Sequence, residues 1–283
     1  MKMLNLGCGT RYHTEWVNID FVTTSPQVIA HNLLNGIPFA DAHFDAVYHS
    51  HVLEHFTKED AANLLQECHR VLKPNGVLRV VVPDLENMVN QYIKWRDLAI
   101  DGDKEAPLNY DWIMLELYDQ VARNFSGGYM AQHLSQDAIL NADFVRERMG
   151  TAFELYRRNV KKANVLVKQS QSSSDGIWRR FIRLPLARAL NQWKQKLLNP
   201  LIDQYWRERR YRKVGKFRLS GEIHQWMYDR YSLTQLLIQC GFRNPKACGA
   251  TESLIPNWTE FNLDTEPDGS VYKADSLFME AVK

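Results

Sequence analysis

The first part of the chain alternates short apolar runs with polar turns. Apolar runs lie at residues 3–6, 16–19 and 44–48, and each is about as long as a buried strand. They end, in order, in Gly7-Cys8-Gly9-Thr10, in Asp20 and in His49-Ser50-His51. Polar residues therefore follow predicted strands, at the edge where open α/β sheets bind ligands.

A helix and a further strand follow these runs. From Thr57 to Leu72 apolar residues recur at helical spacing, with Thr57 as a suitable N-cap and Asp60 three residues later. Residues 73–76, Lys-Pro-Asn-Gly, end this helix, and residues 77–82 form a β-branched run of the kind found in strands covered on both faces. Strand, helix and strand at this spacing predict a parallel crossover unit in an α/β fold.

The glycines of the first loop suit the approach of a ligand. Glycine adopts positive φ without strain and has no Cβ, so the N–H groups around Gly7 and Gly9 can face a polar nucleoside. The carboxylate of Asp20 suits the two hydroxyl donors of a ribose. The same residues also describe a tight turn followed by an exposed aspartate, and a lone Gly-x-Gly does not separate the two interpretations.

Four motifs in order resemble those of class I S-adenosylmethionine-dependent methyltransferases, in the subgroup that modifies saccharides and small molecules. They are LNLGCG, Asp20, FDAVYHSHVLEHF and RVLKPNGVLRVVVPD, all within the first 84 residues. The resemblance resumes at residues 231–242, similar to the last helix and turn, and at 276–282, similar to the final strand. It implies an α/β, Rossmann-like, mostly parallel sheet with an antiparallel last strand, and S-adenosylmethionine as cofactor.

The resemblance also implies a set of cofactor-binding residues. Gly7 and Gly9 would approach the methionine part, and Asp20 would take the ribose. Asn32 and Leu33 fall where the family contacts adenine. The remaining cofactor residues are Asn5 and Cys8 around the first loop, and His49 and Ser50 beside the methionine amino group.

The sequence departs from the family pattern at two places. Only ten residues separate Gly9 from Asp20, too few for the usual helix, so we expect a loop there. Asn32 stands where the family more often has aspartate, although an amide oxygen can still accept a hydrogen bond from the adenine amino group.

Two insertions are expected between the matching parts. Residues 1–84 and 221–283 would form the methyltransferase core, and 85–168 a helical insertion. Within that insertion Tyr118, Asp119, Gln120, Arg123 and His133 surround a glycine turn, a mixture that suits a substrate wall or lid. Residues 169–220 would form a basic amphipathic insertion after a Gln/Ser-rich linker.

Charge is divided unevenly along the chain. The net charge is +2, but residues 157–218 contain 18 Lys and Arg against three acidic residues. The alternation of apolar and basic residues over 177–218 predicts peripheral contact with an anionic membrane. Packing against the acidic remainder of the protein explains the pattern equally well, and nucleic acid ranks behind both.

Composition favours a cytoplasmic globular protein. The 283 residues are 45% hydrophobic, enough for a full core. The four cysteines form no CxxC pair, and we expect neither a signal peptide nor a transmembrane helix.

A histidine is the expected general base. A neutral imidazole suits removal of a hydroxyl proton near pH 7, and His51 is the first candidate, with His224 and Asp84 as alternates. Residues 51–55 also fit H-x-x-E-H, an inverted zinc-protease motif. No third ligand is apparent in the sequence, so we expect no metal.

The predicted activity is O-methylation of a sugar, saccharide or other small polar metabolite. Two alternatives stay open at this point. One is an RNA methyltransferase that uses the basic insertion, and the other is a cofactor-binding or scaffold protein with the same fold and no turnover.

Overall fold

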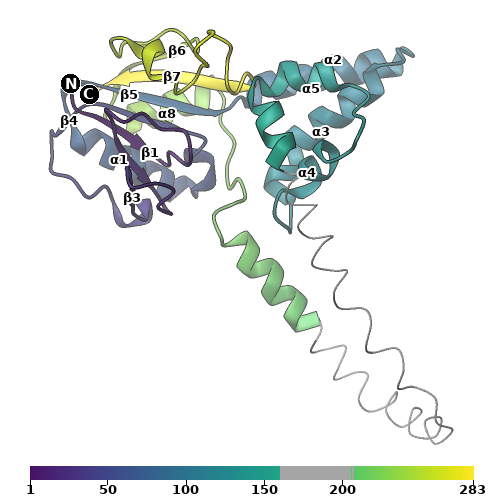
Figure 1. The fold of residues 1–283 in the computed structure, drawn as a ribbon, viewed down its shortest axis with the longest axis horizontal. Coiled ribbons are helices and arrows are strands. Elements are labelled where there is room, and N and C mark those ends of the chain that lie inside the picture. Colours follow the sequence, from purple (N-terminus) through teal and green to yellow (C-terminus); the bar gives the residue numbers. More distant parts are fainter. Residues whose placement is uncertain (160–204, 206) are drawn as a thin grey trace, which may run out of the picture.

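The computed structural model describes residues 1–159, 205 and 207–283. These residues contain one sheet, formed by β1 Met3–Leu6, β2 Val17–Asp20, β3 Val28–Ala30, β4 Phe44–Ser50, β5 Leu72–Pro83, β6 Arg243–Cys248 and β7 Ser276–Val282. The strand order is β3-β2-β1-β4-β5-β7-β6 (Figure 1). Strands β1 to β5 pair in parallel, and β7 is antiparallel to both β5 and β6. The predicted Rossmann-like sheet with its antiparallel last strand is confirmed.

The α-helices of the described residues all follow β4 in the chain. They are α1 Lys58–Val71, α2 Leu85–Ile100, α3 Ala106–Ala122, α4 Gly128–Leu134, α5 Ala142–Met149 and α8 Arg230–Gln239, with short 3-10 turns η1 Leu33–Asn35, η2 Leu53–His55 and η4 Trp258–Phe261. Residues 152–159 and 207–218 are also helical. Most of the predicted insertion 169–220 lies outside the described residues.

Helix α1 begins where its sequence predicts. The Thr57 Oγ1 accepts a hydrogen bond from the Asp60 N–H, and the Thr57 hydroxyl donates to the Asp60 carboxylate at 2.7 Å. These bonds satisfy a free N–H of the first turn. The apolar face of the helix then packs on the sheet, with Leu64, Leu65 and Cys68 buried.

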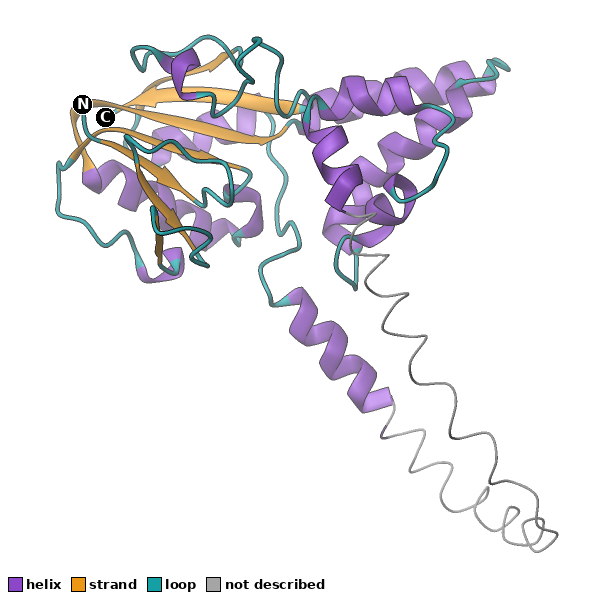
Figure 2. Cartoon of the chain, in the orientation of Figure 1, coloured by secondary structure: helices purple, strands orange, loops and turns teal. Residues whose placement is uncertain are grey.

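The two faces of the sheet are covered in different ways. In β5, Val80 and Val82 pack in one core with α1 and α8, whereas Val81 between them faces a second core. Figure 2 shows the two helices on one side of the strands, and loops with a short helical turn on the other. The second core contains Trp16 and Trp258, whose rings meet edge to face at 6.1 Å. Residues 249–275, between β6 and β7, provide much of this second cover.

A buried guanidinium holds that cover in place. Arg79 on β5 is fully buried, and its Nε donates to Asp264 Oδ2 at 2.8 Å. It also donates to Glu280 on β7 at 2.9 Å and to the main-chain carbonyls of residues 249, 250 and 252. Both Asp264 and Glu280 are buried. One cation therefore joins two strands to the beginning and the middle of the covering segment.

The helical insertion forms a separate apolar core. Helices α2 to α5 lie beyond the carboxyl end of β5 (Figure 1), and Trp112, Ile113, Val145 and Phe153 are buried among them. An ion pair is buried with them, because Arg148 Nη2 lies 2.6 Å from Glu116 Oε2. Burial raises the pKa of Glu116 to about 7, even though Arg148 acts in the opposite direction.

Replacing Arg79 by methionine should destabilise the fold strongly. Arg79→Met leaves the carboxylates of Asp264 and Glu280 buried without their cation, which typically costs about 3–5 kcal/mol of the free energy of unfolding. Urea denaturation of the variant and the wild type measures this loss. Arg230→Met is the matched control, because Arg230 forms an exposed ion pair with Glu86 and should change the midpoint little. Equal midpoints for the two variants would contradict the role of Arg79.

Candidate active site

A cavity of about 250 Å³ lies at the carboxyl ends of β1 and β4. Three segments line it: the first loop (Asn5, Gly7, Cys8, Gly9, Thr10, Arg11), the end of β4 (Tyr48, Ser50, His51) and the segment before β7 (Leu263, Tyr272, Lys273). Six residues that the sequence analysis assigned to the site are among them. Burial raises the pKa of Cys8 to about 11, so this side chain faces the site as a neutral thiol.

The two glycines of the first loop have different roles. Both have positive φ, +63° for Gly7 and +55° for Gly9. A Cβ on Gly7 would lie 2.3 Å from Val52 Cγ2, whereas one on Gly9 would meet nothing within 4 Å. Gly7 is therefore required for packing, and Gly9 leaves the backbone of the loop open to the cavity.

Asp20 organises the first loop. Its Oδ2 accepts a hydrogen bond from the Gly9 N–H at 2.8 Å, and its Oδ1 accepts one from the Val22 N–H at 3.2 Å. The Thr24 hydroxyl donates to the Gly9 carbonyl at 2.8 Å. A carboxylate offers about four acceptor positions, so Asp20 can hold the loop and still accept from a ligand hydroxyl. As predicted, residues 10–16 form no helix.

Arg11 joins the first loop to the other end of the chain. Its Nε donates to the Leu263 carbonyl at 2.8 Å, its Nη1 lies 3.0 Å from Glu266, and its guanidinium lies 3.9 Å from the centre of the Tyr272 ring. The Asn5 amide in turn donates to the Arg11 carbonyl. Sequence analysis missed Arg11, because no local pattern relates it to partners more than 250 residues away.

Four predicted cofactor residues are not among those that line this cavity, namely Asp20 behind the first loop and Asn32, Leu33 and His49. The Asn32 side chain accepts from the Leu34 N–H at 3.0 Å and so caps η1. Leu33 lines a separate cavity of about 110 Å³ beside α1. His49 is fully buried, and neither of its ring nitrogens has a hydrogen-bond partner among the described residues. Their predicted roles in cofactor binding stay predictions.

His51 lines the cavity in an unusual backbone conformation. Its φ is +54°, and its N–H donates to the Val81 carbonyl. The ring lies between two side chains, with Nε2 2.9 Å from Ser276 Oγ and Nδ1 3.2 Å from Glu54 Oε1. Burial, and then the charge of Lys273, lower the pKa of His51. The imidazole is therefore neutral at pH 7, as a general base must be.

Glu54 is a fully buried carboxylate among histidines. Burial raises its pKa, but the contact with His51 outweighs this, and the pKa of Glu54 lies below its usual value. Glu54 is therefore ionised, and its charge can stabilise a protonated His51.

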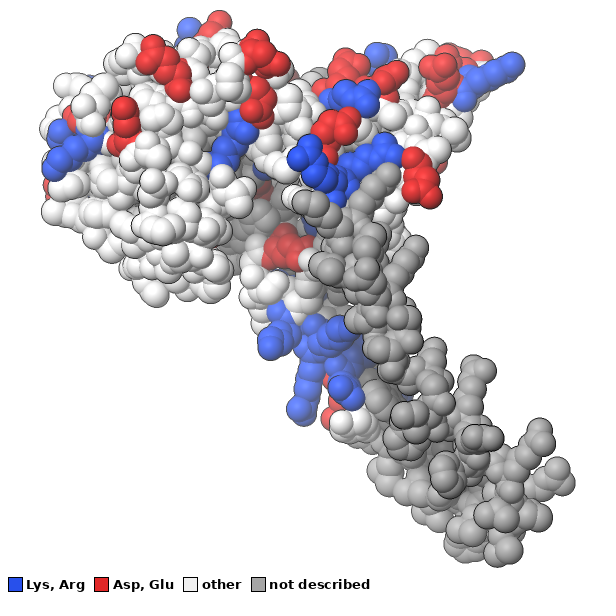
Figure 3. Space-filling view, viewed as in Figure 1, with Lys and Arg blue, Asp and Glu red and all other residues white. Residues whose placement is uncertain are grey.

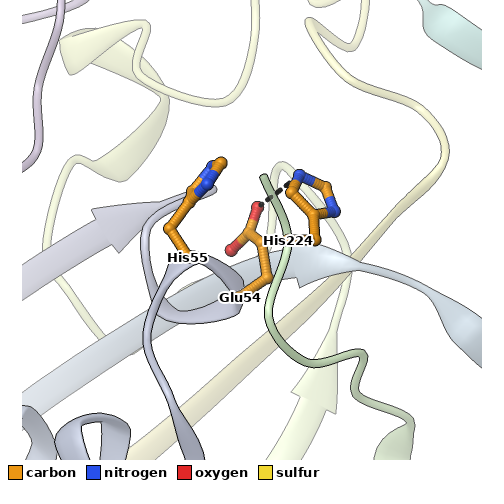
Figure 4. A group of neighbouring side chains, drawn as sticks. All are labelled: Glu54, His55 and His224. Carbon is orange, nitrogen blue, oxygen red and sulfur yellow. Dashed lines mark ion pairs between the residues drawn. The ribbon is translucent and has the colours of Figure 1, made fainter. Parts of the chain in front are cut away.

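The two alternate bases do not line the cavity. His224 is buried with Nε2 3.9 Å from Glu54 Oε1, and burial lowers its pKa to about 3 (Figure 4). Asp84 accepts from the Asn87 N–H at 3.1 Å as the N-cap of α2, and burial raises its pKa. Of the three predicted bases, the structure brings His51 alone to the cavity.

The predicted substrate wall in the helical insertion forms a groove. Tyr118, Asp119, Arg123, Phe125 and Tyr129 are among the residues that line a cavity of about 360 Å³. Asp119 accepts from the Tyr129 N–H at 2.7 Å at the start of α4. The predicted role of this insertion in acceptor binding stays a prediction.

The described part of the basic insertion is a helix at residues 207–218. It contains seven Lys and Arg, and basic side chains gather on it in Figure 3. The rest of the membrane-contact segment predicted at 177–218 lies outside the described residues. In the part of the chain that the structure covers, no helix combines the length and hydrophobicity that a membrane span needs.

Residues 4–80 match the model of a family described as a methyltransferase domain. The match runs from β1 into β5 and includes the cavity-lining residues of the first loop and of β4. It supports the resemblance to class I methyltransferases and leaves the saccharide subgroup open. No curated protein matches the chain.

The chain is also similar to solved structures of methyltransferases from several organisms. A SAM-dependent methyltransferase from Archaeoglobus fulgidus is 11% identical, with 100% of this chain and 86% of that chain covered and a TM-score of 0.36. The 1,6-didemethyltoxoflavin-N1-methyltransferase of Burkholderia thailandensis, solved with S-adenosylhomocysteine, is 18% identical, with 29% and 44% covered and a TM-score of 0.25.

His49 should make the domain that contains the sheet less stable in acid. Burial lowers its pKa from 6.5 to about 4, so the unfolded state binds a proton first as the pH falls. The stability that comes from keeping His49 neutral is fully present above pH 6.5 and is lost as the pH falls to 4. The total loss of unfolding free energy is on the order of 3 kcal/mol. His49→Leu should therefore lose less unfolding free energy than the wild type over this range, measured by urea denaturation at several pH values. The partly exposed His31 provides the control variant His31→Leu, and an unchanged slope for His49→Leu would refute the prediction.

Proposed function

We propose that this protein is an S-adenosylmethionine-dependent methyltransferase that methylates an oxygen of a sugar, saccharide or similar polar metabolite. One observation carries the proposal: the glycine loop and the end of β4, which lie within the methyltransferase domain match, line one cavity together with His51. A cofactor loop and a candidate base thus face the same space.

The first loop and Lys273 suit the polar ends of this cofactor. Gly9 lines the cavity without a side chain, and its N–H donates to Asp20. Lys273 lines the same cavity, and its pKa is lowered by burial. An ammonium group in this position would attract the methionine carboxylate, while Asp20 would accept from a ribose hydroxyl.

His51 and Glu54 suit the removal of a hydroxyl proton. The cofactor supplies a methyl group that its sulfonium already activates, so the chain must orient the acceptor and remove its proton. Glu54 beside Nδ1 favours the tautomer that leaves Nε2 as the base, on the side of Ser276. The proton would move to Nε2, and the Glu54 carboxylate would stabilise the imidazolium that forms.

The basic helix supports a contact with an anionic surface. Arg210, Arg212, Lys213 and Lys216 follow one another along residues 207–218, and each cation near an anionic membrane is worth about 1 kcal/mol. We propose that this helix and the preceding residues from 177 contact the membrane peripherally. RNA binding that weakens steeply with salt would instead favour the RNA methyltransferase.

Binding of S-adenosylhomocysteine should depend on Gly9. Gly9 lines the cavity and a Cβ on it would meet no protein atom within 4 Å, so in Gly9→Ala the new methyl group should take up space needed by the ligand and the Kd should rise at least about tenfold, which is about 1.4 kcal/mol. Isothermal titration calorimetry of the purified protein measures this. Gly102→Ala is the matched control, because Gly102 has φ +87°, a Cβ there would also meet nothing within 4 Å, and the residue lies outside the cavity. Wild-type protein that binds neither S-adenosylmethionine nor its product would overturn the cofactor assignment and favour the scaffold alternative.

Loss of the imidazole at position 51 should slow turnover without a comparable loss of cofactor binding. His51→Asn is the suitable variant, because asparagine tolerates the left-handed backbone found at this position. With an acceptor identified from a panel of sugars, the rate of S-adenosylhomocysteine formation should fall about 10²–10⁴-fold. His69→Ala on α1 should leave the rate unchanged. If His51→Asn kept the wild-type rate and pH profile, the base would lie elsewhere.

A further inference from the structure

A second cluster of polar side chains lies next to the candidate active site. Glu54 and His55 belong to η2, and His224 belongs to the segment that leads into α8. One ligand atom from each residue lies within 4.8 Å of the other two. Figure 4 shows the two imidazole rings on either side of the Glu54 carboxylate. The sequence motif H-x-x-E-H contains two of these residues, Glu54 and His55, and the fold brings His224 beside them from about 170 residues away.

Main-chain hydrogen bonds hold the two segments together. The N–H groups of Gln225 and Trp226 both donate to the Glu54 carbonyl, at 2.7 and 3.2 Å. The Gln225 side-chain amide donates to the His55 carbonyl at 3.0 Å. On the other side, the His224 N–H donates to the Gln120 carbonyl of α3. The backbones that carry the three side chains are therefore fixed relative to each other.

His55 is supported from behind in the way that metal-ligating histidines usually are. His55 Nδ1 lies 3.1 Å from the Ile223 carbonyl, which can only accept, so Nδ1 carries the proton and Nε2 keeps its lone pair. A carbonyl behind a ligating histidine is the usual support in metal sites. His224 is buried, and its Nδ1 has no hydrogen-bond partner among the described residues.

The carboxylate at the centre has unused acceptor capacity. Glu54 is 0% exposed, and in the described part of the chain neither oxygen accepts a hydrogen bond of ordinary geometry. The carboxylate faces His51 through Oε1 and still has lone pairs for a cation. A buried carboxylate without such bonds is costly, and a cation between the three side chains would satisfy it.

We propose that Glu54, His55 and His224 bind one divalent transition-metal ion of the zinc class, which clips the 223–226 segment onto η2 beside the candidate active site. Two imidazoles and one carboxylate suit zinc and its neighbours, whereas magnesium prefers oxygen ligands throughout. Ligand atoms around zinc are separated by about 3.4 Å. The 3.9 Å between His224 Nε2 and Glu54 Oε1 is close to this, and small side-chain rotations would close the remaining gaps.

His51 is not part of this proposed site. Its ring lies between Ser276 and Glu54. His51 is the first histidine of the H-x-x-E-H motif, which would bind zinc in a zinc protease, but here it lines the cavity. A metal ion bound there would contact the Glu54 carboxylate, which also lies beside the candidate base His51. The proposal does not depend on methyl transfer, and the two can fail separately.

Metal titration of the untagged full-length protein tests the proposal. After treatment with a chelator and dialysis, the wild type should bind one equivalent of Zn²⁺ by calorimetry. Co²⁺ should give the visible absorption of a nitrogen- and oxygen-ligated ion, and millimolar Mg²⁺ should not displace it. Glu54→Gln and His224→Ala should each weaken Zn²⁺ binding by at least about 100-fold.

His69→Ala is the matched control, because His69 lies on α1 outside the cluster, and it should bind Zn²⁺ as the wild type does. Circular dichroism identifies any variant that fails to fold. If both ligand variants fail to fold, the titration of the wild type with Zn²⁺ and Co²⁺ decides whether the proposal holds. Absence of Zn²⁺ and Co²⁺ uptake by the wild type would overturn the proposal. Unchanged affinity in a folded Glu54→Gln variant would overturn it as well. A parallel titration with S-adenosylhomocysteine tests the cofactor independently.

Discussion

The buried guanidinium of Arg79 is the contact on which the cavity depends. The connection between β1 and β2 is too short for a helix, so one face of the sheet needs another cover. Residues 249–275 provide it, and Arg79 holds that segment through Asp264 and main-chain carbonyls. The end of the same segment then reaches the first loop through Arg11 and brings Tyr272 and Lys273 to the cavity. An ion cluster inside the fold thus positions one wall of the candidate active site.

Glu54 is a second buried charge close to the cavity, because it lies beside His51. Its side chain lies beside His51, which lines the cavity, and beside His224, which lies between the basic helix and α8. Its carbonyl also accepts from Gln225 and Trp226. The segment that follows the basic helix is therefore hydrogen-bonded to the residue whose carboxylate lies beside the candidate base. This links the region expected to contact an anionic surface with the region expected to perform chemistry.

The candidate site was predictable where its signals are local. The glycine loop, the polar end of β4 and the helix after Thr57 are each contained in a few neighbouring residues, and the structure places the first two around one cavity. The assignments from resemblance were less complete, because Asn32 and His49 lie outside that cavity. Arg11, Lys273 and the Arg79 cluster carried no local signal, since their partners are far away in sequence.

The sequence by itself determined the strands, the crossover helix and the Rossmann-like class, because hydrophobic periodicity and capping act between neighbours along the chain. It also determined that a loop, and not a helix, follows Gly9. Only the tertiary structure decided that residues 249–275 cover one face, that His51 and not His224 faces the cavity, and that His224 joins Glu54 and His55. These arrangements depend on packing and ion pairing between distant segments, which periodicity does not encode.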